Sequence, residues 1–172
     1  SFFEMSVGLA FDYFAQEKVD IAIIEVGLGG RLDSTNIITP EVSLITNIGV
    51  DHVDILGKTL KEIAFEKAGI IKPNVPVVVS ETQEGLVETF ISIAEKRKAK
   101  IIFASDIVKG DYKTALLGKY QDRNIKGVIA ALSELKGYEI FDLHIKEGLL
   151  RVSENTGLLG RWQILQKKPL VI

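Results

Sequence analysis

Residues 20–36 read D-I-A-I-I-E-V-G-L-G-G-R-L-D-S-T-N, and this stretch decides the fold class. Its first seven residues are almost continuously apolar, which is typical of a strand buried on both faces of a sheet. The glycine-rich run 27–30 ends that strand and begins a loop. Because strands of this kind belong mainly to parallel sheets, we expect the loop to lie at a strand's carboxyl end, where ligands bind.

Helices and strands alternate on both sides of this stretch. Apolar residues at helical spacing predict a helix that ends near Glu17. Thr59 and Glu62 form a capping-box pattern and Gly69 suits a C-terminal cap, which predicts a helix over Leu60–Ala68. The remaining expected elements are strands at 42–48, 75–79 and 100–104, helices at 86–97 and about 125–135, and a small β-element within 138–153. The alternation predicts an α/β fold with a mainly parallel sheet and helices on both faces.

The composition is that of one globular domain. The chain has 172 residues, of which 47% are hydrophobic, and 21 basic residues stand against 23 acidic ones. That charge balance argues against a nucleic-acid partner, and the apolar runs are too short to cross a membrane. The absence of cysteine excludes disulfides and thiolate chemistry and fits a cytoplasmic location, which we expect. The residues near the start lack the basic stretch that is typical of a signal peptide.

Two glycine motifs resemble nucleotide-binding signatures but are incomplete. The segment 27–32 has Leu32 where a dinucleotide motif has its third glycine. The segment 57–59 reads G-K-T, but His52 occupies the place of the first glycine of a P-loop. Neither segment therefore predicts a nucleotide site by itself.

Three polar residues remain as candidates for chemistry. Glu25 interrupts the apolar strand, either as a functional carboxylate or as a glutamate that reaches water or Arg31. His52 lies between two aspartates, and it either ligates a metal or acts in acid–base catalysis, or it simply pairs with an aspartate. Lys67 lies in the last turn of its predicted helix, where a lysine usually complements the helix dipole.

Together these residues resemble a known family. The run 25–36 closely resembles the E-V-G-L-G-G-R-L-D-A-T-N signature of folylpolyglutamate and dihydrofolate synthases, with one difference at Ser34. The pairs 51–52 and 56–57 and the run 66–70 follow in the family's order. Further similarities are Phe3-Glu4, Gly118-x-x-Gln121-x-x-Asn124 and Gly160-Arg161. The resemblance covers nearly the whole chain and implies the central-domain fold of the Mur ligases.

The resemblance also implies an activity. Members of this family use ATP and Mg²⁺ to phosphorylate a carboxylate, and an amine then attacks the acyl phosphate to form an amide. The expected function is the addition of L-glutamate to a reduced folate, and also to dihydropteroate in some members. Expected partners are these small molecules and not nucleic acid or membrane, and the parent protein is expected to be monomeric. The alternatives are another Mur-like amino-acid ligase and a non-catalytic ligand-binding domain.

Roles for individual residues follow from the same resemblance. Glu25 is expected to hold a magnesium ion, and His52 to ligate a second metal and take part in catalysis. Lys67 matches a catalytic lysine that the family carries as a carbamate, whose formation requires the neutral amine. The residues expected to contact ATP are Asn124 and Arg161, and those expected to contact the pterin substrate are Ser1, Phe2, Phe3, Glu4, Leu32, Asp33 and Ser34. The stretch before Asn124 is shorter than the family's.

The resemblance finally predicts how the chain is organised. Residues 1–165 are expected to form a central ATPase-type domain without its N-terminal P-loop segment. Residues 166–172 are expected to be a linker or the start of a C-terminal domain. We therefore expect a fragment of a longer ligase that is inactive by itself, because nothing in it cradles the β- and γ-phosphates of ATP.

Overall fold

A parallel three-stranded sheet lies at the centre of the computed structural model, which describes residues 1–158, 166–168 and 170–171. Its strands are β1 (Ser43–Ile45), β2 (Val77–Val79) and β3 (Ile101–Phe103), and they are ordered β1-β2-β3. The middle residues of the three strands, Leu44, Val78 and Ile102, are paired in register. Three of the predicted strands are thus confirmed, each shorter than its apolar run.

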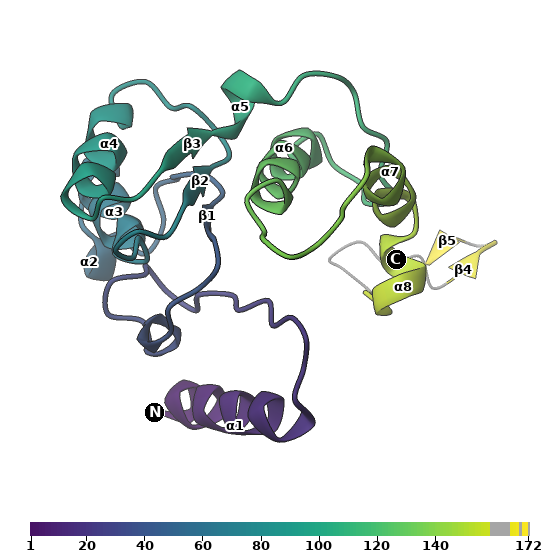
Figure 1. Ribbon diagram of the computed structural model, residues 1–172, viewed down its shortest axis with the longest axis horizontal. Helices are drawn as coiled ribbons and strands as arrows, with labels where there is room; N and C mark the ends of the chain where they lie inside the picture. The colour runs from purple at the N-terminus through teal and green to yellow at the C-terminus, as the bar shows by residue number, and fades with distance from the viewer. Residues whose placement is uncertain (159–165, 169, 172) are drawn as a thin grey trace.

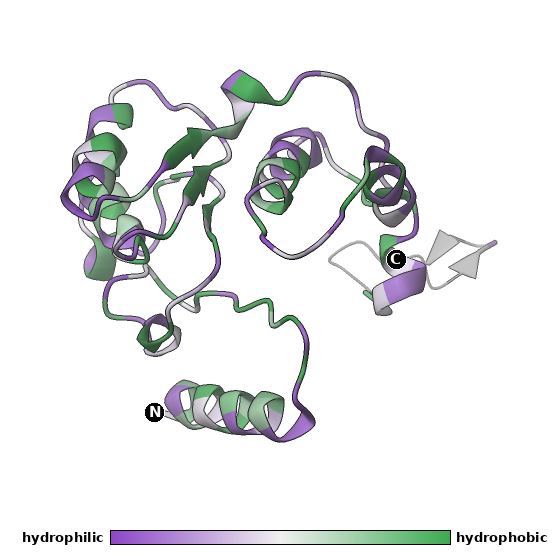
Figure 2. Ribbon diagram, viewed as in Figure 1, coloured by the Kyte–Doolittle hydropathy of each residue, from purple (hydrophilic) through white to green (hydrophobic). Residues whose placement is uncertain are grey.

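Helices cover both faces of this sheet (Figure 1). On one face, α3 (Leu60–Ala68) and α4 (Val87–Lys96) pack against alternate strand residues such as Val77 and Val79. On the other face, α5 (Ala104–Ile107) and α6 (Gln121–Leu132) pack near Val78. Figure 2 shows that apolar residues dominate the three strands between these layers. The two-faced burial confirms the predicted α/β fold class.

Helix α3 begins and ends where its sequence predicts. The Thr59 hydroxyl accepts the Glu62 N–H at 3.2 Å, and a Glu62 carboxylate oxygen accepts the Thr59 N–H at 2.9 Å. At the other end, the Gly69 N–H donates to the Glu66 carbonyl at 3.2 Å. Both helix termini are therefore satisfied by residues close in sequence, which is why local patterns suffice to predict the bounds.

The segment 20–26 is not a strand, which contradicts the prediction. Ile21 is 53% exposed and Ile23 is 91% exposed, while Ile24 and Val26 are only partly buried. A strand is buried on both faces only when neighbouring strands pair with it, and no described strand pairs with this segment. Helix α1 (Phe2–Glu17) precedes it as predicted, although none of its residues is buried.

The β-element expected within residues 138–153 is helical instead. The residues form α7 (Asp142–Leu150) and the start of α8 (Val152–Thr156). Asp142 and Lys146 lie one helical turn apart and form an i,i+4 ion pair at 2.5 Å, with the acid toward the helix N-terminus. Beyond them, β4 (Gln166–Lys167) pairs antiparallel with β5 (Leu170–Val171). No helix in the described ranges is long and apolar enough to cross a membrane.

Helix α6 approaches the sheet closely at Gly127. A Cβ atom at this position would lie 1.9 Å from Ser80 Oγ and 2.9 Å from Ser80 Cβ. Ser80 directly follows β2 and is 1% exposed. Among the described residues, its hydroxyl has no hydrogen-bond partner. The missing side chain of Gly127 therefore sets the distance between α6 and the sheet.

Replacing Gly127 by alanine should destabilise the domain by about 1–3 kcal/mol, because the new methyl group overpacks this contact. The matched control is Gly148→Ala in α7, where a Cβ meets no atom within 4 Å. That change should stabilise by about 0.5–1 kcal/mol through helix propensity. Equilibrium urea unfolding measures both effects. Adding Ser80→Ala should partly restore the Gly127→Ala variant, and equal stability of the two glycine variants would contradict the close contact.

Candidate active site

The glycine-rich loop 27–30 packs directly on the last turn of α3. A Cβ atom at Gly30 would lie 2.9 Å from the carbonyl oxygens of Glu66 and Lys67. A Cβ atom at Gly69 would lie 2.3 Å from Cα of Arg31. Both distances are shorter than a side chain tolerates, so each glycine permits one backbone to touch another. Two segments separated by more than thirty residues thereby become one unit.

Hydrogen bonds fasten the two segments at this contact. The Arg31 N–H donates to the Glu66 carbonyl at 2.8 Å, and the Asn36 side-chain amide donates to the Gly69 carbonyl at 3.0 Å. Lys72 in turn donates to the Asn36 carbonyl at 2.7 Å. The carbonyls at a helix C-terminus have no partner within the helix, and here the loop supplies donors for them.

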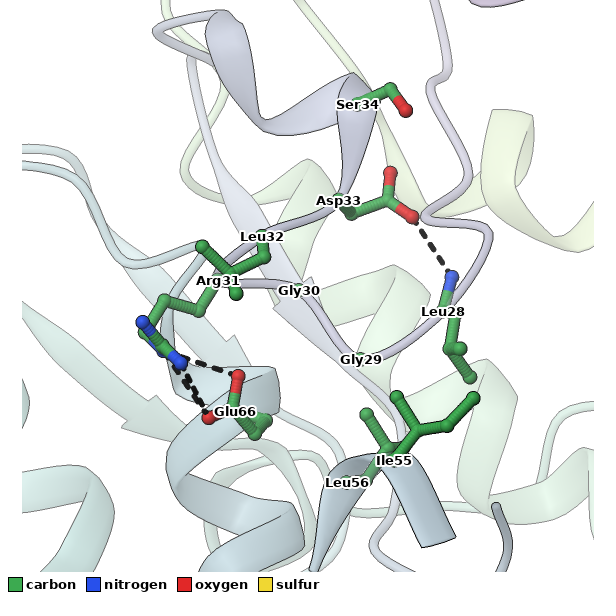
Figure 3. Close-up of a pocket in the computed structure, with 10 residues that line it drawn as sticks. All are labelled: Leu28, Gly29, Gly30, Arg31, Leu32, Asp33, Ser34, Ile55, Leu56 and Glu66. Atoms are coloured by element: carbon green, nitrogen blue, oxygen red, sulfur yellow. Dashed lines mark hydrogen bonds and ion pairs between the residues drawn. The ribbon is translucent and has the colours of Figure 1, made fainter. Parts of the chain in front are cut away.

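The Arg31 side chain also forms an ion pair with the Glu66 carboxylate. Its Nε lies 3.2 and 3.1 Å from the two carboxylate oxygens, and its Nη2 lies 3.0 Å from one of them (Figure 3). The sequence predicted Arg31 as a possible partner for Glu25, but in the structure Arg31 pairs with Glu66. Glu25 is exposed and makes no hydrogen bond or ion pair with any described residue.

Asp33 holds the loop together from inside. Its carboxylate accepts the N–H groups of Leu28 and Thr35, each at 2.9 Å, and also the Thr35 hydroxyl. Desolvation by burial acts to raise the pKa of Asp33, but the hydrogen bonds from Thr35 and from the backbone of Leu28 and Gly27 outweigh it, so the pKa is lowered. The Asp33 carboxylate, which the resemblance implies as a substrate contact, thus forms hydrogen bonds within its own loop.

A cleft of about 230 Å³ opens along this loop. Figure 3 shows Leu32, Asp33 and Ser34 on one side of it, with Ile55 and Leu56 of α2 (Val53–Leu56) opposite. The lining also includes Leu28, Gly29, Gly30, Arg31 and Glu66. A second hollow of about 420 Å³ shares Ile55, Leu56 and Glu66 with the first. The two hollows therefore adjoin over the α2–α3 surface.

The start of α1 lies beside the same loop. Helix α1 contacts the short helix η1 (Ser34–Ile37). The Phe3 ring lies so close to Gly27 that a Cβ atom on Gly27 would be 2.3 Å from Phe3 Cζ. Ser1 caps α1 by accepting the Glu4 N–H at 3.3 Å, and Phe2 is 82% exposed. The candidates at 1–4 and at 32–34 therefore come from neighbouring elements.

His52 occupies an unusual backbone position after β1. It caps α2 with φ 49° and ψ 41°, the left-handed region that costs a non-glycine residue roughly 1–2 kcal/mol. Its side chain is exposed, and Nε2 lies 3.8 Å from an Asp51 carboxylate oxygen. Strained residues of this kind cluster at functional sites, although the aspartate pairing fits the plainer interpretation as well.

Lys67 and Asn124 lie on two different helices. Lys67 is half-buried in the last turn of α3, and its amine makes no hydrogen bond or ion pair within the described residues. Asn124 lies in the first turn of α6 and donates to the Gln121 side-chain oxygen at 3.2 Å. The neighbouring Arg123 pairs with Glu81, just beyond β2, which places this turn near the carboxyl edge of the sheet. Arg161 lies outside the described residues.

No preformed metal-binding cluster is present in the described part of the chain. None of its His, Asp and Glu residues gather in groups of three or more that could hold an ion. Glu25 and His52 are therefore available only as individual ligands, one carboxylate and one imidazole.

Sequence reasoning missed the residues that join the loop to α3. Arg31, Asn36, Glu66 and Gly69 were quoted as parts of motifs, yet no role was predicted for their mutual contacts. The only signal was the pairing of two glycine-containing motifs, which does not reveal that they meet in space.

Comparisons with known proteins identify the family of the chain. The Mur ligase middle domain family matches residues 3–128. The dihydrofolate synthase/folylpolyglutamate synthase of Bacillus subtilis is 36% identical over 197 positions, covering 98% of this chain and 44% of that protein. The protein of the same name from Haemophilus influenzae is 46% identical over 176 positions, covering 96% and 40%.

Solved structures of similar proteins share the fold. A bifunctional folylpolyglutamate synthase/dihydrofolate synthase from Yersinia pestis, complexed with AMPPNP and a Mn ion, matches with TM-score 0.80 and 29% identity over 100% of this chain and 43% of that one. An FPGS–AMPPCP–folate complex matches with TM-score 0.83 and 29% identity, over 96% and 46%. The predicted resemblance of the chain to folylpolyglutamate and dihydrofolate synthases is thereby confirmed. The chain spans less than half the length of these relatives.

Substituting Gly69 by alanine should separate the loop from α3 and lower the free energy of unfolding by about 1–3 kcal/mol, because the new Cβ would lie within the Arg31 backbone. Gly49→Ala is the control, since a Cβ there meets nothing within 4 Å, and it should change stability by less than about 0.5 kcal/mol. Urea unfolding measures both variants. Indistinguishable curves would show that the close packing carries no stability.

Asp33 should contribute to the acid sensitivity of the domain. Its pKa is lower in the folded state than in the unfolded chain, so its contribution is present above about pH 4 and is lost as pH falls through the folded pKa. In urea unfolding between pH 7 and pH 2.5, Asp33→Asn should be less stable at pH 7 and should lose less stability on acidification than the wild type. Parallel pH profiles for the two proteins would show that the ionised Asp33 carboxylate does not stabilise the loop.

Proposed function

The chain belongs to the Mur ligase middle domain family, and we propose that it is the central part of a folylpolyglutamate/dihydrofolate synthase. The proposed parent protein joins L-glutamate to a reduced folate, and to dihydropteroate, by way of an acyl phosphate made with ATP. The observation that carries the proposal is the contact between the loop 27–36 and the last turn of α3. It places the motif most characteristic of the folate ligases beside Lys67.

The cleft along residues 28–34 is the proposed place of the pterin substrate. Support comes from its position next to the start of α1, since residues 1–4 and 32–34 were both assigned to substrate and lie on adjoining elements. Leu32 is 80% exposed and offers an apolar surface to a planar ring, and Ile55 across the cleft is 70% exposed. Because Asp33 already clasps the loop, its proposed role is to hold Leu32 and Ser34 toward the substrate.

Lys67 is the proposed catalytic lysine, carried as a carbamate. The Lys67 ammonium first loses a proton. The neutral amine then reacts with carbon dioxide, which forms a new N–C bond, releases a second proton and leaves an anionic carbamate that can act as an oxygen ligand. The half-buried amine has no partner among the described residues, so no ion pair has to be broken first. Lys96, in the last turn of α4, shows the ordinary case, an exposed lysine that complements a helix dipole.

Glu25 and His52 are the proposed metal ligands. Magnesium usually takes one or two carboxylates from a protein and completes its coordination with phosphate oxygens and water. Single ligands fit that pattern, although an imidazole is a less usual magnesium ligand than a carboxylate. When bound, the ion would offset negative charge on the phosphates. Asn124 and Arg161 are proposed to contact ATP, and the similar Yersinia pestis protein, complexed with AMPPNP and a Mn ion, supports this class of cofactor.

The proposed organisation assigns residues 1–165 to the central domain and residues 166–172 to a linker or the start of a further domain. The sequence contains no complete P-loop, so the chain by itself should not ligate glutamate.

In the whole protein, Lys67→Ala should lower the rate of ATP-dependent glutamate addition by about 100-fold or more, which is the scale for losing one group that stabilises the transition state. Lys96→Ala is the control, because it removes a lysine from the last turn of the neighbouring helix. The assay follows ADP release with tetrahydrofolate and with dihydropteroate as acceptors. Near-normal turnover of Lys67→Ala would remove Lys67 from the mechanism, and failure of the wild type with both acceptors would refute the proposed substrate class.

A further inference from the structure

The backbone of the last turn of α3 sets where the Lys67 side chain leaves the helix. Its amine has no hydrogen-bond or ion-pair partner within the described ranges. The residue lies in the last turn of α3, where carbonyl groups lack partners within the helix and the chain tends to fray. A catalytic group in such a turn needs support from outside the helix, because small misplacements reduce rates strongly.

That support comes from the loop, and it is concentrated on the residue before Lys67. The Glu66 carbonyl accepts the Arg31 N–H at 2.8 Å, and the Glu66 carboxylate accepts three guanidinium contacts between 3.0 and 3.2 Å. Asn36 adds bonds to the Gly69 carbonyl at 3.0 Å and to the Arg31 carbonyl at 3.2 Å. Backbone and side chain of Arg31 thus hold backbone and side chain of Glu66.

The Arg31–Glu66 pair is poorly suited to a purely stabilising role. The side chains are 46% and 20% exposed, and an ion pair in such a partly solvated setting adds little to folding stability. Its geometry is nonetheless specific, because the planar guanidinium fork meets both carboxylate oxygens. A contact of low stability and high directionality fits a role in orientation.

We propose that Arg31 and Glu66 are positioning residues for Lys67, an inference that rests on the proposed function of that lysine. The pair holds the last turn of α3 against the glycine loop, so that the modified side chain leaves α3 in one fixed direction. Arg31 also lines the cleft, so the competing role is direct contact with substrate. The two roles differ in the kinetic parameter that they affect.

The test is made in the whole protein with Arg31→Ala, Glu66→Ala and the double variant. Each single change should lower kcat about 10- to 100-fold, while KM for folate and for ATP changes by less than about twofold. The double variant should be no slower than the slower single variant, because both changes break the same contact. Arg31→Lys should remain impaired, since an ammonium group cannot form the two-pronged contact.

A spectroscopic measurement separates positioning from loss of fold. The carbamate signal from ¹³C-labelled bicarbonate, assigned by its disappearance in Lys67→Ala, should weaken in Arg31→Ala at unchanged thermal midpoint. The matched control is Lys100→Ala, which breaks a two-contact pair with Glu134, at 2.8 and 3.0 Å, on a different part of the surface. That variant should keep the wild-type kcat, KM and carbamate signal.

Several outcomes would overturn the inference. A raised KM for folate at constant kcat would make Arg31 a substrate-binding residue, and multiplicative losses in the double variant would show that the two residues act separately. Unchanged kcat in Arg31→Ala would end the proposal, provided that Lys67→Ala is inactive. Full activity of Lys67→Ala would instead refute the proposed function of the lysine, so the two failures are distinguishable.

Discussion

The backbone contact between the glycine loop and the last turn of α3 is the constraint on which the rest of the site depends. Gly30 and Gly69 each lack the one atom that would keep the two segments apart. Because backbone touches backbone, the geometry does not vary with side-chain rotamers. The direction of the loop, the walls of the cleft and the place of Lys67 relative to residues 32–34 all follow from it.

Polar residues of the motif divide into two groups according to their partners. Asp33 and Asn36 form hydrogen bonds with backbone groups, as short polar side chains commonly do in loops, and Arg31 pairs with Glu66. Glu25 and Lys67 have no partner among the described residues. A group that the fold does not use is available for ligands. The division supports the proposed assignment of chemistry to the second group and of shape to the first.

The two failures of prediction have different physical causes. Residues 20–26 have the composition of a buried strand, but burial depends on neighbouring strands, and Ile23 is 91% exposed. Residues 141–145 alternate like a strand, but the Asp142–Lys146 pair acts at helical spacing. The helix at 60–68 was predicted to its ends because its capping groups are local. Prediction thus succeeded where the capping partners are near in sequence. It failed at residues 20–26 because no described strand pairs with them, and at residues 141–145 because so short an apolar pattern does not distinguish a strand from a helix.

The sequence by itself determined the fold class, the bounds of α3 and the family, because apolar periodicity, capping residues and a twelve-residue motif are properties of short segments. It also supplied Glu25, His52 and Lys67 as candidates. Only the tertiary structure decided that Arg31 pairs with Glu66 and that the glycines at 30 and 69 face each other's segments. Contacts between segments more than thirty residues apart depend on how the layers pack, and no local pattern encodes that distance.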